Sequence, residues 1–225
     1  MTITVIIPAL NEAGAIARTI ESAAGAEIIV ADGGSGDDTV AIARRLGAQA
    51  VEETGGRGAQ QNAGAAMAGP GNPLLFLHAD TLLPSGWMQD VEQLLSRTDT
   101  ALGAFSLRIA DARPAEKVIA AGASLRSRCF GLPYGDQALF LRRDAFDRLG
   151  GFRPLPIMED YDLVRRARTL GRVVTLQALV ETSPRRWRSK GALRSVAINQ
   201  AMLAGWHLGL SPERLARLYR GLARR

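Results

Sequence analysis

The first half of the chain alternates short apolar segments with segments of helical character, and this alternation constrains the fold more than any other feature. The apolar segments cover residues 4–7, 27–31, 48–53 and 74–77, and each has the length of a buried strand. Strand and helix repeated in this order are typical of a parallel sheet with right-handed crossovers. We therefore expect an α/β fold with helices flanking a mostly parallel central sheet.

Turn and capping residues indicate where the helices begin and end. Asn11 is a suitable N-cap for a helix that runs to about residue 24. Asp37 or Asp38 would cap a helix over 39–46, which Gly47 would terminate. Further helices are expected over 58–68, 85–96, 114–128 and 159–170, a half-buried strand over 104–109, and strands over 138–141 and 172–181.

The strand at 74–77 is followed by His78-Ala79-Asp80, and Pro84 lies shortly after. In an open α/β sheet, ligands bind beyond the carboxyl ends of the strands. Magnesium usually takes one or two protein carboxylates and completes its shell with water and substrate phosphates. One interpretation of Asp80 is therefore a metal bridge to a diphosphate, and the other is a cap on the next helix.

A second acid, Asp32, ends the strand at 27–31 and is followed by Gly33, Gly34, Ser35 and Gly36. The glycines permit tight turns and close approach of the backbone to a ligand. Asp32 could bond a ribose hydroxyl or a base edge, or it could only satisfy turn amides together with Ser35. Neither the dinucleotide fingerprint after the first strand nor a P-loop occurs in the chain.

Three acids, Glu159, Asp160 and Asp162, occur together where a helix is expected to begin. Negative charge there complements the helix dipole, which is the structural explanation. The functional explanation is a general base directed into a cleft. Helix geometry places Glu159 and Asp162 on one face and Asp160 on another, so one acid can face a site while its neighbours cap or pair with Arg165 and Arg166.

Six short motifs together are similar to those of a known enzyme family. The sequence resembles the family 2 glycosyltransferases of the GT-A fold, and most of all their short bacterial members without membrane spans, over roughly residues 3–190. The motifs are Pro8-x-x-Asn11-Glu12, Asp32-Gly33-Gly34-Ser35 with Asp38-Thr39, Asn62-Ala63-Gly64, His78-x-Asp80, Gly150-Gly151-Phe152 and Glu159-Asp160.

The resemblance implies a GT-A fold and an inverting, metal-dependent transfer of sugar from a UDP- or GDP-linked donor. Asp160 matches the acid that deprotonates the acceptor hydroxyl, and Asp80, with His78, would bind Mg²⁺ or Mn²⁺ on the diphosphate. The nucleotide would contact Pro8, Asn11, Glu12, Asp32, Arg57, Asn62 and Ala79. The acceptor side would include Glu159, Asp136, Gln137, Arg186 and Trp187.

Two positions depart from the family pattern. His78 stands where the first acid of the Asp-x-Asp motif is expected, and imidazole is a poorer magnesium ligand than carboxylate. His78 could bind manganese, contact ribose or do neither. The segment ending in Arg186-Trp187 resembles the Gln-x-x-Arg-Trp motif of processive synthases, but Ser183 replaces the glutamine. Arg186 and Trp187 could border an acceptor or form a packed surface pair.

The C-terminal segment carries the excess positive charge of the chain. Residues 185–225 contain ten basic side chains and one acid, whereas the remainder has 18 basic and 21 acidic side chains. We expect a glycosyltransferase domain over 1–190 and a basic helical extension over 191–225, with helices over 192–210 and from Ser211. The extension would pack on the domain or lie on an anionic membrane, and the unidentified acceptor could be lipid-linked. A late histidine completes the metal site in some GT-A enzymes, but His207 is here interpreted as a helix-face residue.

Composition and the N-terminus indicate the compartment. A single cysteine, Cys129, excludes an internal disulfide and is consistent with a reducing environment. Residues 1–8 lack the basic leader and the long apolar core of a signal peptide, and no stretch is long enough to span a membrane. We expect a cytoplasmic protein, with peripheral attachment to the cytoplasmic membrane face as an open alternative.

Two other functions compete with the glycosyltransferase. A sugar-phosphate nucleotidyltransferase shares this layout of sheet and metal, but it usually has a glycine-rich basic loop after the first strand, where this chain has Pro8-Ala9-Leu10-Asn11. A non-catalytic module that binds anionic polymers would use the basic tail. It would leave the acids at the strand ends without a role, so we do not expect nucleic acid as a partner.

Overall fold

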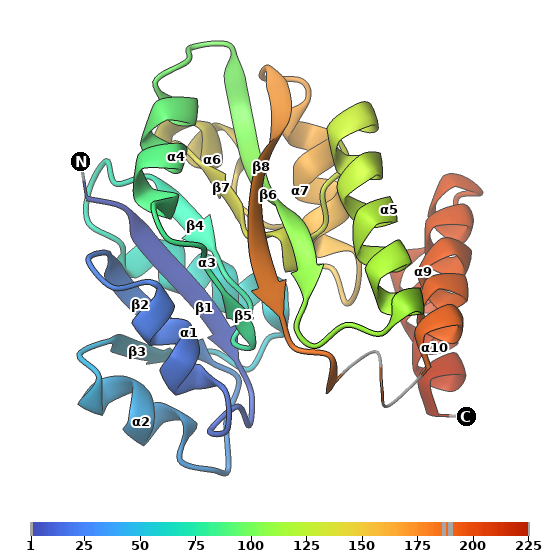
Figure 1. The fold of residues 1–225 in the computed structure, drawn as a ribbon, viewed down its shortest axis with the longest axis horizontal. Helices are drawn as coiled ribbons and strands as arrows, with labels where there is room; N and C mark the ends of the chain where they lie inside the picture. The colour runs from blue at the N-terminus through green and yellow to red at the C-terminus, as the bar shows by residue number, and fades with distance from the viewer. Residues whose placement is uncertain (1, 186–187, 189–190, 225) are drawn as a thin grey trace.

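The computed structural model describes residues 2–185, 188 and 191–224. Within these residues, eight strands form one sheet in the order β3-β2-β1-β4-β7-β6-β8-β5, with helices on both faces (Figure 1). The strands are β1 (Thr4–Ala9), β2 (Glu27–Asp32), β3 (Gln49–Glu52), β4 (Leu74–Phe76), β5 (Thr81–Leu82), β6 (Thr100–Ile109), β7 (Leu139–Leu141) and β8 (Arg172–Thr182). The helices are α1 (Ile16–Ser22), α2 (Thr39–Arg45), α3 (Arg57–Met67), α4 (Trp87–Leu95), α5 (Pro114–Phe130), η1 (Gly135–Gln137), α6 (Arg143–Leu149), α7 (Glu159–Ala167), α9 (Ala192–His207) and α10 (Pro212–Arg224).

The N-terminal half of the sheet is parallel, as the alternation of strand and helix predicts. Strand β1 pairs in parallel with β2 and β4, and β2 pairs in parallel with β3. Strand β7 runs antiparallel to both β4 and β6, whereas β6 and β8 are parallel. The carboxyl ends of β1, β2 and β4 therefore lie at one edge, where the sequence places its candidate ligands.

Apolar side chains on both faces of the sheet form the core. Along β1, Val5 and Ile7 pack on the face covered by α1 and α4, and Ile6 packs on the face covered by α3, α6 and α7. This alternation follows from the two-residue period of a strand. Strands β1, β4 and β7 are thereby buried on both sides, which is why they read as nearly continuous apolar runs.

Some local predictions are wrong, and each has a physical reason. Asn11 does not cap a helix: its φ is 54°, α1 begins only at Ile16, and the Asn11 side chain accepts a hydrogen bond from the Gly36 backbone N–H. Strand β6 is not half-buried, because α4 and α5 cover one face and α7 covers the other. Helix α6 and the two-residue strand β5 were not predicted from the sequence.

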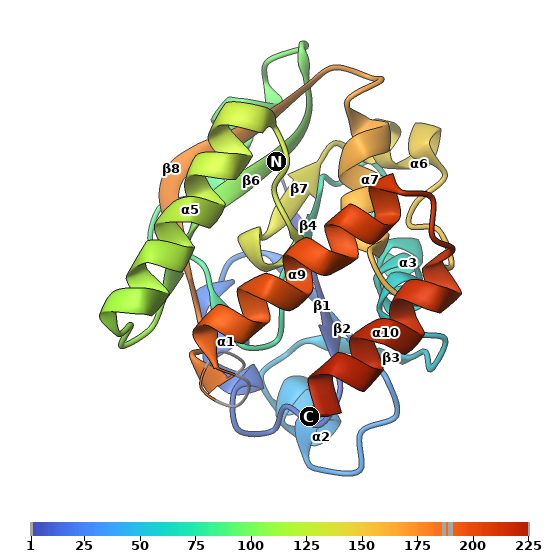
Figure 2. The same cartoon turned by 90° about the vertical axis from the view of Figure 1, so that its right-hand side faces the viewer.

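The two C-terminal helices, α9 and α10, pack beside each other on one side of the molecule (Figure 2). Ile198 and Met202 of α9 and Leu215 of α10 form a small separate core, against which Ile157 and Met158 pack. The hairpin of helices is thereby fixed to the loop that precedes α7. Among the described residues, no helix combines the length and the apolar character that crossing a bilayer requires.

Candidate active site

A cavity of about 870 Å³ lies beyond the carboxyl ends of β1 and β4 and extends to α7 and the C-terminal helices. A second hollow, of about 400 Å³ beside α4, has no charged side chain in its lining. The larger cavity therefore has the chemistry of a reactive site. Of the predicted site residues, those that line it are Pro8, Glu12, Arg57, His78, Ala79, Asp80, Asp136, Glu159 and Asp160.

The loop after β1 is tied to the loop after β2. The backbone N–H of Asn11 donates to Ser35 Oγ at 2.8 Å, and that of Glu12 donates to Thr39 Oγ1 at 2.8 Å. The Asn11 side chain in turn accepts from Gly36. These bonds hold the strand-end loop in place while Glu12 lines the cavity. Asn11 therefore acts on the loop, and contact between Asn11 and a nucleotide stays a prediction.

Asp32 is occupied by its own turn. Its carboxylate accepts hydrogen bonds from the backbone N–H groups of Gly34 and Ser35, at 2.9 and 2.7 Å, and from Ser35 Oγ. Asp32 is 4% exposed and does not line the cavity. This geometry corresponds to the alternative in which Asp32 and Ser35 satisfy turn amides, and contact with ribose or base stays a prediction.

Asp80 faces the cavity and meets a residue that the sequence analysis did not select. Arg185 contacts Glu12 Oε2 at 2.5 Å and Asp80 Oδ2 at 3.5 Å, and these three side chains are 55%, 25% and 22% exposed. The contact follows from the sheet, because β5 pairs antiparallel with the end of β8 and the Ser183 N–H donates to the Asp80 carbonyl. The Glu12 carboxylate, above all, raises the pKa of the Arg185 guanidinium.

The residues around Asp80 fit a divalent cation that is bound partly by the protein and partly by a substrate. Asp80 supplies an accessible carboxylate, and His78 lines the same cavity two residues earlier. Within the described part of the chain, no three His, Cys, Asp or Glu side chains converge on one point. The remaining ligands of a cation held here would be diphosphate oxygens and water, which is the usual arrangement for Mg²⁺.

Asp160 is fixed in the cavity by two backbone donors. The Gly135 N–H donates to Asp160 Oδ2 at 2.6 Å, and the Tyr161 N–H donates to Oδ1 at 2.7 Å. A Cβ added at Gly135 would lie 3.1 Å from both Asp160 Oδ2 and His78 Nε2, so the loop backbone approaches both side chains closely. A side chain at position 135 would crowd both groups, so glycine favours this approach, and the two backbone donors hold the carboxylate in one orientation.

Glu159 also lines the cavity, but it is more deeply buried than Asp80. Its side chain is 10% exposed and lies 4.0 Å from Arg57 Nη1. Burial, followed by the nearby charge of Asp160, raises the pKa of Glu159 to about 7, and Arg57 opposes this rise. Glu159 and Asp160 both line the cavity, although only one of the three acids was expected to face a site. Asp162 pairs with Arg166 at 2.7 Å, as predicted for the neighbouring acids.

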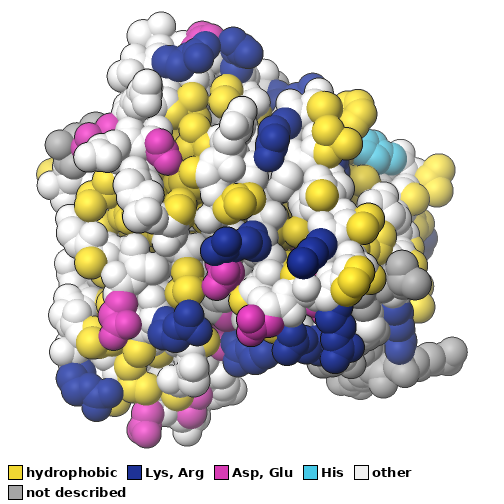
Figure 3. Space-filling model, viewed as in Figure 1, with side chains coloured by type: hydrophobic (Ala, Val, Ile, Leu, Met, Phe, Trp, Pro, Cys, Tyr) yellow, Lys and Arg dark blue, Asp and Glu magenta, His cyan; other side chains and the backbone are white. Residues whose placement is uncertain are grey.

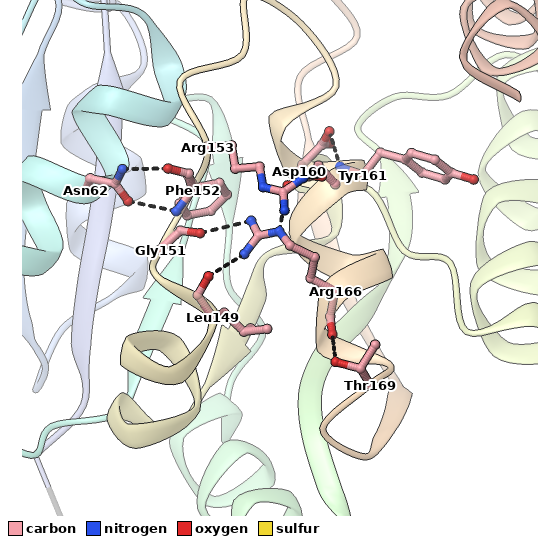
Figure 4. A network of polar contacts seen from close by, with 10 residues as sticks. Asn62, Leu149, Gly151, Phe152, Arg153, Asp160, Tyr161, Arg166 and Thr169 are labelled. Carbon is pink, nitrogen blue, oxygen red and sulfur yellow. Dashed lines mark hydrogen bonds and ion pairs between the residues drawn. The ribbon is translucent and has the colours of Figure 1, made fainter. Parts of the chain in front are cut away.

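A polar network behind the cavity fixes the turn that leads to α7 (Figure 4). Asn62 donates from Nδ2 to the Phe152 carbonyl at 2.8 Å and accepts from the Phe152 N–H at 2.9 Å. Arg166 donates to the carbonyls of Leu149 and Gly151, at 2.7 and 2.9 Å. Asn62 does not line the cavity. Its observed role is to hold this turn, and a contact between Asn62 and the nucleotide stays a prediction.

The acceptor-side predictions fall into three groups. Asp136 and Glu159 line the cavity, whereas Gln137 is fully buried and donates to the Phe105 carbonyl at 2.8 Å and to Ser127 Oγ at 2.9 Å. Gln137 therefore supports the loop from behind. Arg186 and Trp187 lie outside the described residues.

Several cavity residues have no counterpart in the sequence predictions. Tyr134 lines the cavity, and the Arg126 guanidinium lies 3.6 Å from the centre of its ring. Tyr134 directly precedes Gly135 and the predicted site residue Asp136, and this position could have indicated that Tyr134 faces the cavity. The C-terminal helices also contribute, and no pattern in the sequence indicates which of their residues face the cavity: Asn199, Met202, Ala216, Tyr219 and Arg220.

His207 is exposed and lies 2.9 Å, at Nε2, from the Tyr161 hydroxyl. This position agrees with its interpretation as a helix-face residue.

Comparison with known proteins agrees with this arrangement. The sequence model of Glycosyl transferase family 2 matches residues 4–154, about two thirds of the chain. The match includes the strand ends with Asp32 and Asp80 and stops just before Glu159 and Asp160.

Three solved structures illustrate the similarity of fold. TarS 1–349 from S. aureus, in complex with UDP-GlcNAc, is 17% identical, with a TM-score of 0.63 over 81% of this chain and 58% of that one. Mannosyltransferase PcManGT from Pyrobaculum calidifontis, in complex with GDP-Man and Mn²⁺, is 20% identical, with a TM-score of 0.66 over 98% of this chain and 68% of that one. Glucosyl-3-phosphoglycerate synthase from Mycobacterium tuberculosis is 23% identical, with a TM-score of 0.56 over 80% of this chain and 70% of that one. The expected GT-A fold is confirmed.

Proposed function

Because the chain belongs to glycosyl transferase family 2, we propose that it transfers a sugar from a nucleoside-diphosphate donor to an acceptor hydroxyl, with inversion at the sugar carbon. One observation carries this proposal. A single cavity has Asp80 at the end of β4 and Asp160 at the start of α7. The same cavity thus contains Asp80, which can bind a cation together with a diphosphate, and Asp160, which can accept a proton.

The donor would occupy the side of the cavity formed by β1, α3 and the end of β4. Pro8 and Glu12 line this side after β1, and Arg57 lines it at the start of α3. Arg57 is about half exposed and can turn toward a phosphate. UDP and GDP donors are the two candidates, since TarS was solved with UDP-GlcNAc and PcManGT with GDP-Man.

Asp80, with His78 beside it, would hold Mg²⁺ or Mn²⁺ against the donor diphosphate. Such a cation, when bound, supplies positive charge that stabilises the departing diphosphate. Arg185 provides a second positive group at the same place, because in this structure it contacts Asp80 and Glu12. We propose that the Arg185 guanidinium turns from these carboxylates to the diphosphate when the donor binds.

Asp160 would act as the general base. Its two backbone hydrogen bonds hold the carboxylate toward the cavity, where it takes the proton of the acceptor hydroxyl. The acceptor oxygen forms its bond to the sugar carbon on the face opposite the diphosphate. The bond from that carbon to the diphosphate oxygen breaks, and its electron pair leaves with the nucleoside diphosphate. Configuration at the carbon is therefore inverted.

The acceptor would approach from the side of the C-terminal helices. Met202 of α9 and Ala216 and Tyr219 of α10 line this part of the cavity, together with Ile157 and Met158. We propose that residues 191–225 are an extension that completes this wall around the domain formed by 1–190. The apolar lining supports an acceptor with an apolar portion, such as a lipid-linked one, used at the cytoplasmic face of a membrane.

The test is a binding screen followed by a transfer assay. UDP, GDP and their sugar conjugates are titrated calorimetrically with and without Mn²⁺, and the preferred donor is then followed by NMR in the presence of candidate acceptors. The proposal expects one nucleotide to bind more tightly with Mn²⁺ and the product to have the opposite anomeric configuration. Release of pyrophosphate from a nucleoside triphosphate and a sugar phosphate would instead identify a nucleotidyltransferase.

A further inference from the structure

The helices α5, α9 and α10 form the layer of the molecule that faces the viewer in Figure 2. Ten large hydrophobic side chains are exposed in the described part of the chain, and six of them lie on or directly after these helices. Three, Val118, Leu125 and Phe130, are on α5 and are between 63% and 72% exposed. The others are Leu208, which ends α9, and Leu218 and Leu222 on α10. Exposed apolar surface is thus concentrated on this layer.

The exposed apolar residues follow the helical period. On α5, Val118, Ala121, Leu125 and Cys129 are all exposed and recur at intervals of three or four residues. The outward face of α9 is similar, since Ala197, Ala201, Ala204 and Leu208 are all exposed. The inward faces of both helices are already packed, on the sheet for α5 and on the cavity loop for α9. Apolar side chains exposed in this number on neighbouring helices indicate an interaction site.

The same layer is strongly basic. The described side chains of the three helices include two acids, and one of them, Glu116, is buried with its carboxylate bonded to the Arg113 N–H. The other is Glu213. Among the basic side chains, Arg126 stacks on Tyr134 and Arg220 lines the cavity. The other five are exposed: Lys117, Arg128, Arg194, Arg214 and Arg217. In Figure 3, dark blue and yellow side chains lie next to each other over α5, with little magenta between them.

We propose that the outward faces of α5, α9 and α10 form a docking surface for an anionic lipid bilayer. A bilayer accepts both components, because exposed apolar side chains enter the acyl boundary while arginines contact the phosphate groups. Duplex nucleic acid would use the arginines but would leave Val118, Leu125 and Phe130 without a role. A second copy of the chain would bring two positively charged faces together. The bilayer fits both properties of the surface.

The proposal goes beyond the transfer reaction and does not require it. It is nevertheless consistent with it, since the inner faces of α9 and α10 line the cavity through Met202 and Tyr219. Docking of the outer faces would place the acceptor side of the cavity next to the lipid headgroups.

The test measures binding of the full chain to vesicles by co-sedimentation. Two compositions are compared, phosphatidylcholine alone and phosphatidylcholine mixed equally with phosphatidylglycerol, at low and at high salt. The variant Val118→Ser/Leu125→Ser/Phe130→Ser removes apolar side chains, and the variant Arg214→Gln/Arg217→Gln removes charge. The matched control, Leu46→Ser/Met67→Ser, changes hydrophobic residues that are also exposed but lie directly after α2 and at the end of α3. Thermal melting confirms that each variant is folded.

The proposal expects binding to the anionic vesicles that salt weakens and little binding to phosphatidylcholine. The arginine variant should bind about fivefold more weakly for each charge removed. The apolar variant should also lose at least tenfold, and the control should bind as the native chain does. Equal binding of all variants, or no binding to anionic vesicles, would overturn the proposal. Duplex binding that survives the apolar substitutions, or a dimer that those substitutions dissociate, would also overturn it.

Discussion

Replacing Asn62 with alanine separates two roles for a residue that the family resemblance places near the nucleotide. In the structure, both polar atoms of the Asn62 side chain bond the backbone of Phe152, at 2.8 and 2.9 Å. Phe152 is 2% exposed, so the substitution leaves a buried N–H and a buried carbonyl without these partners. Asn62 itself lines no part of the cavity. We therefore expect Asn62→Ala to lower stability first.

The magnitude follows from the two bonds. A buried polar group that loses its partner costs about 1–3 kcal/mol. Asn62 is only half buried, so water can reach part of the vacated space, and we expect a total loss of about 2–3 kcal/mol rather than the upper limit. For a chain of this length, about 1 kcal/mol shifts Tm by roughly 2–4 °C. The expected decrease in Tm is therefore about 4–12 °C.

The assay combines thermal melting with calorimetric titration of the preferred nucleotide, at a temperature well below both melting transitions. We expect the Kd to change by less than about threefold, because the substituted side chain is outside the cavity. Gln89→Ala is the control, since Gln89 is exposed on α4. An unchanged Tm together with a tenfold weaker Kd would show that Asn62 binds the nucleotide and would refute this reasoning.

Three further predictions concern the cavity itself. Asp160→Asn should lower kcat about 10²- to 10⁴-fold while the donor Kd stays within about threefold, and full transfer activity would exclude it as the base. Arg185→Ala should weaken binding of the nucleoside diphosphate with Mn²⁺ by about tenfold in calorimetry. The reason is that a charge-assisted bond from Arg185 to the diphosphate outweighs the ion pairs of Arg185 with Glu12 and Asp80, and an unchanged Kd would argue against the proposed movement of Arg185. The pKa of Glu159 is raised to about 7 in the folded state. Between pH about 4.5 and 7, Glu159 is therefore protonated in the folded state and ionised in the unfolded chain. The free energy of unfolding should fall as pH rises through that range. Urea unfolding should show that Glu159→Gln flattens this part of the profile, and an identical profile would contradict the assignment.

The strand pattern of the N-terminal half predicts the parallel sheet, because few other folds bury short apolar strands that alternate with helices. The ends of β2 and β4 are within a residue of their expected positions, so Asp32 and Asp80 lie at or shortly after strand ends, as predicted. The same pattern does not show whether an acid faces the cavity or its own turn. Asp80 faces the cavity and Asp32 bonds its own turn, although both follow an apolar strand.

Contacts between distant segments account for most of what the sequence analysis missed. Arg185 reaches Asp80 only because a two-residue strand, β5, pairs with the end of β8, and no local pattern marks so short a strand. Asn62 and Phe152 are 90 residues apart. The residue type of Asn11 predicts a helix N-cap, but its side chain instead accepts a hydrogen bond from the Gly36 N–H in the neighbouring loop. Local propensity carries no information about such partners.

The family match ends at residue 154, and the cavity is built from both sides of that boundary. The residues proposed to contact the donor precede that boundary, from Pro8 to Asp80, with the exception of Arg185, which is proposed to contact the diphosphate. The acid at 160, the loop before it and both terminal helices follow it. Exchange of the later segment between relatives could therefore redirect the enzyme to a new recipient molecule while the activated sugar it consumes stays the same.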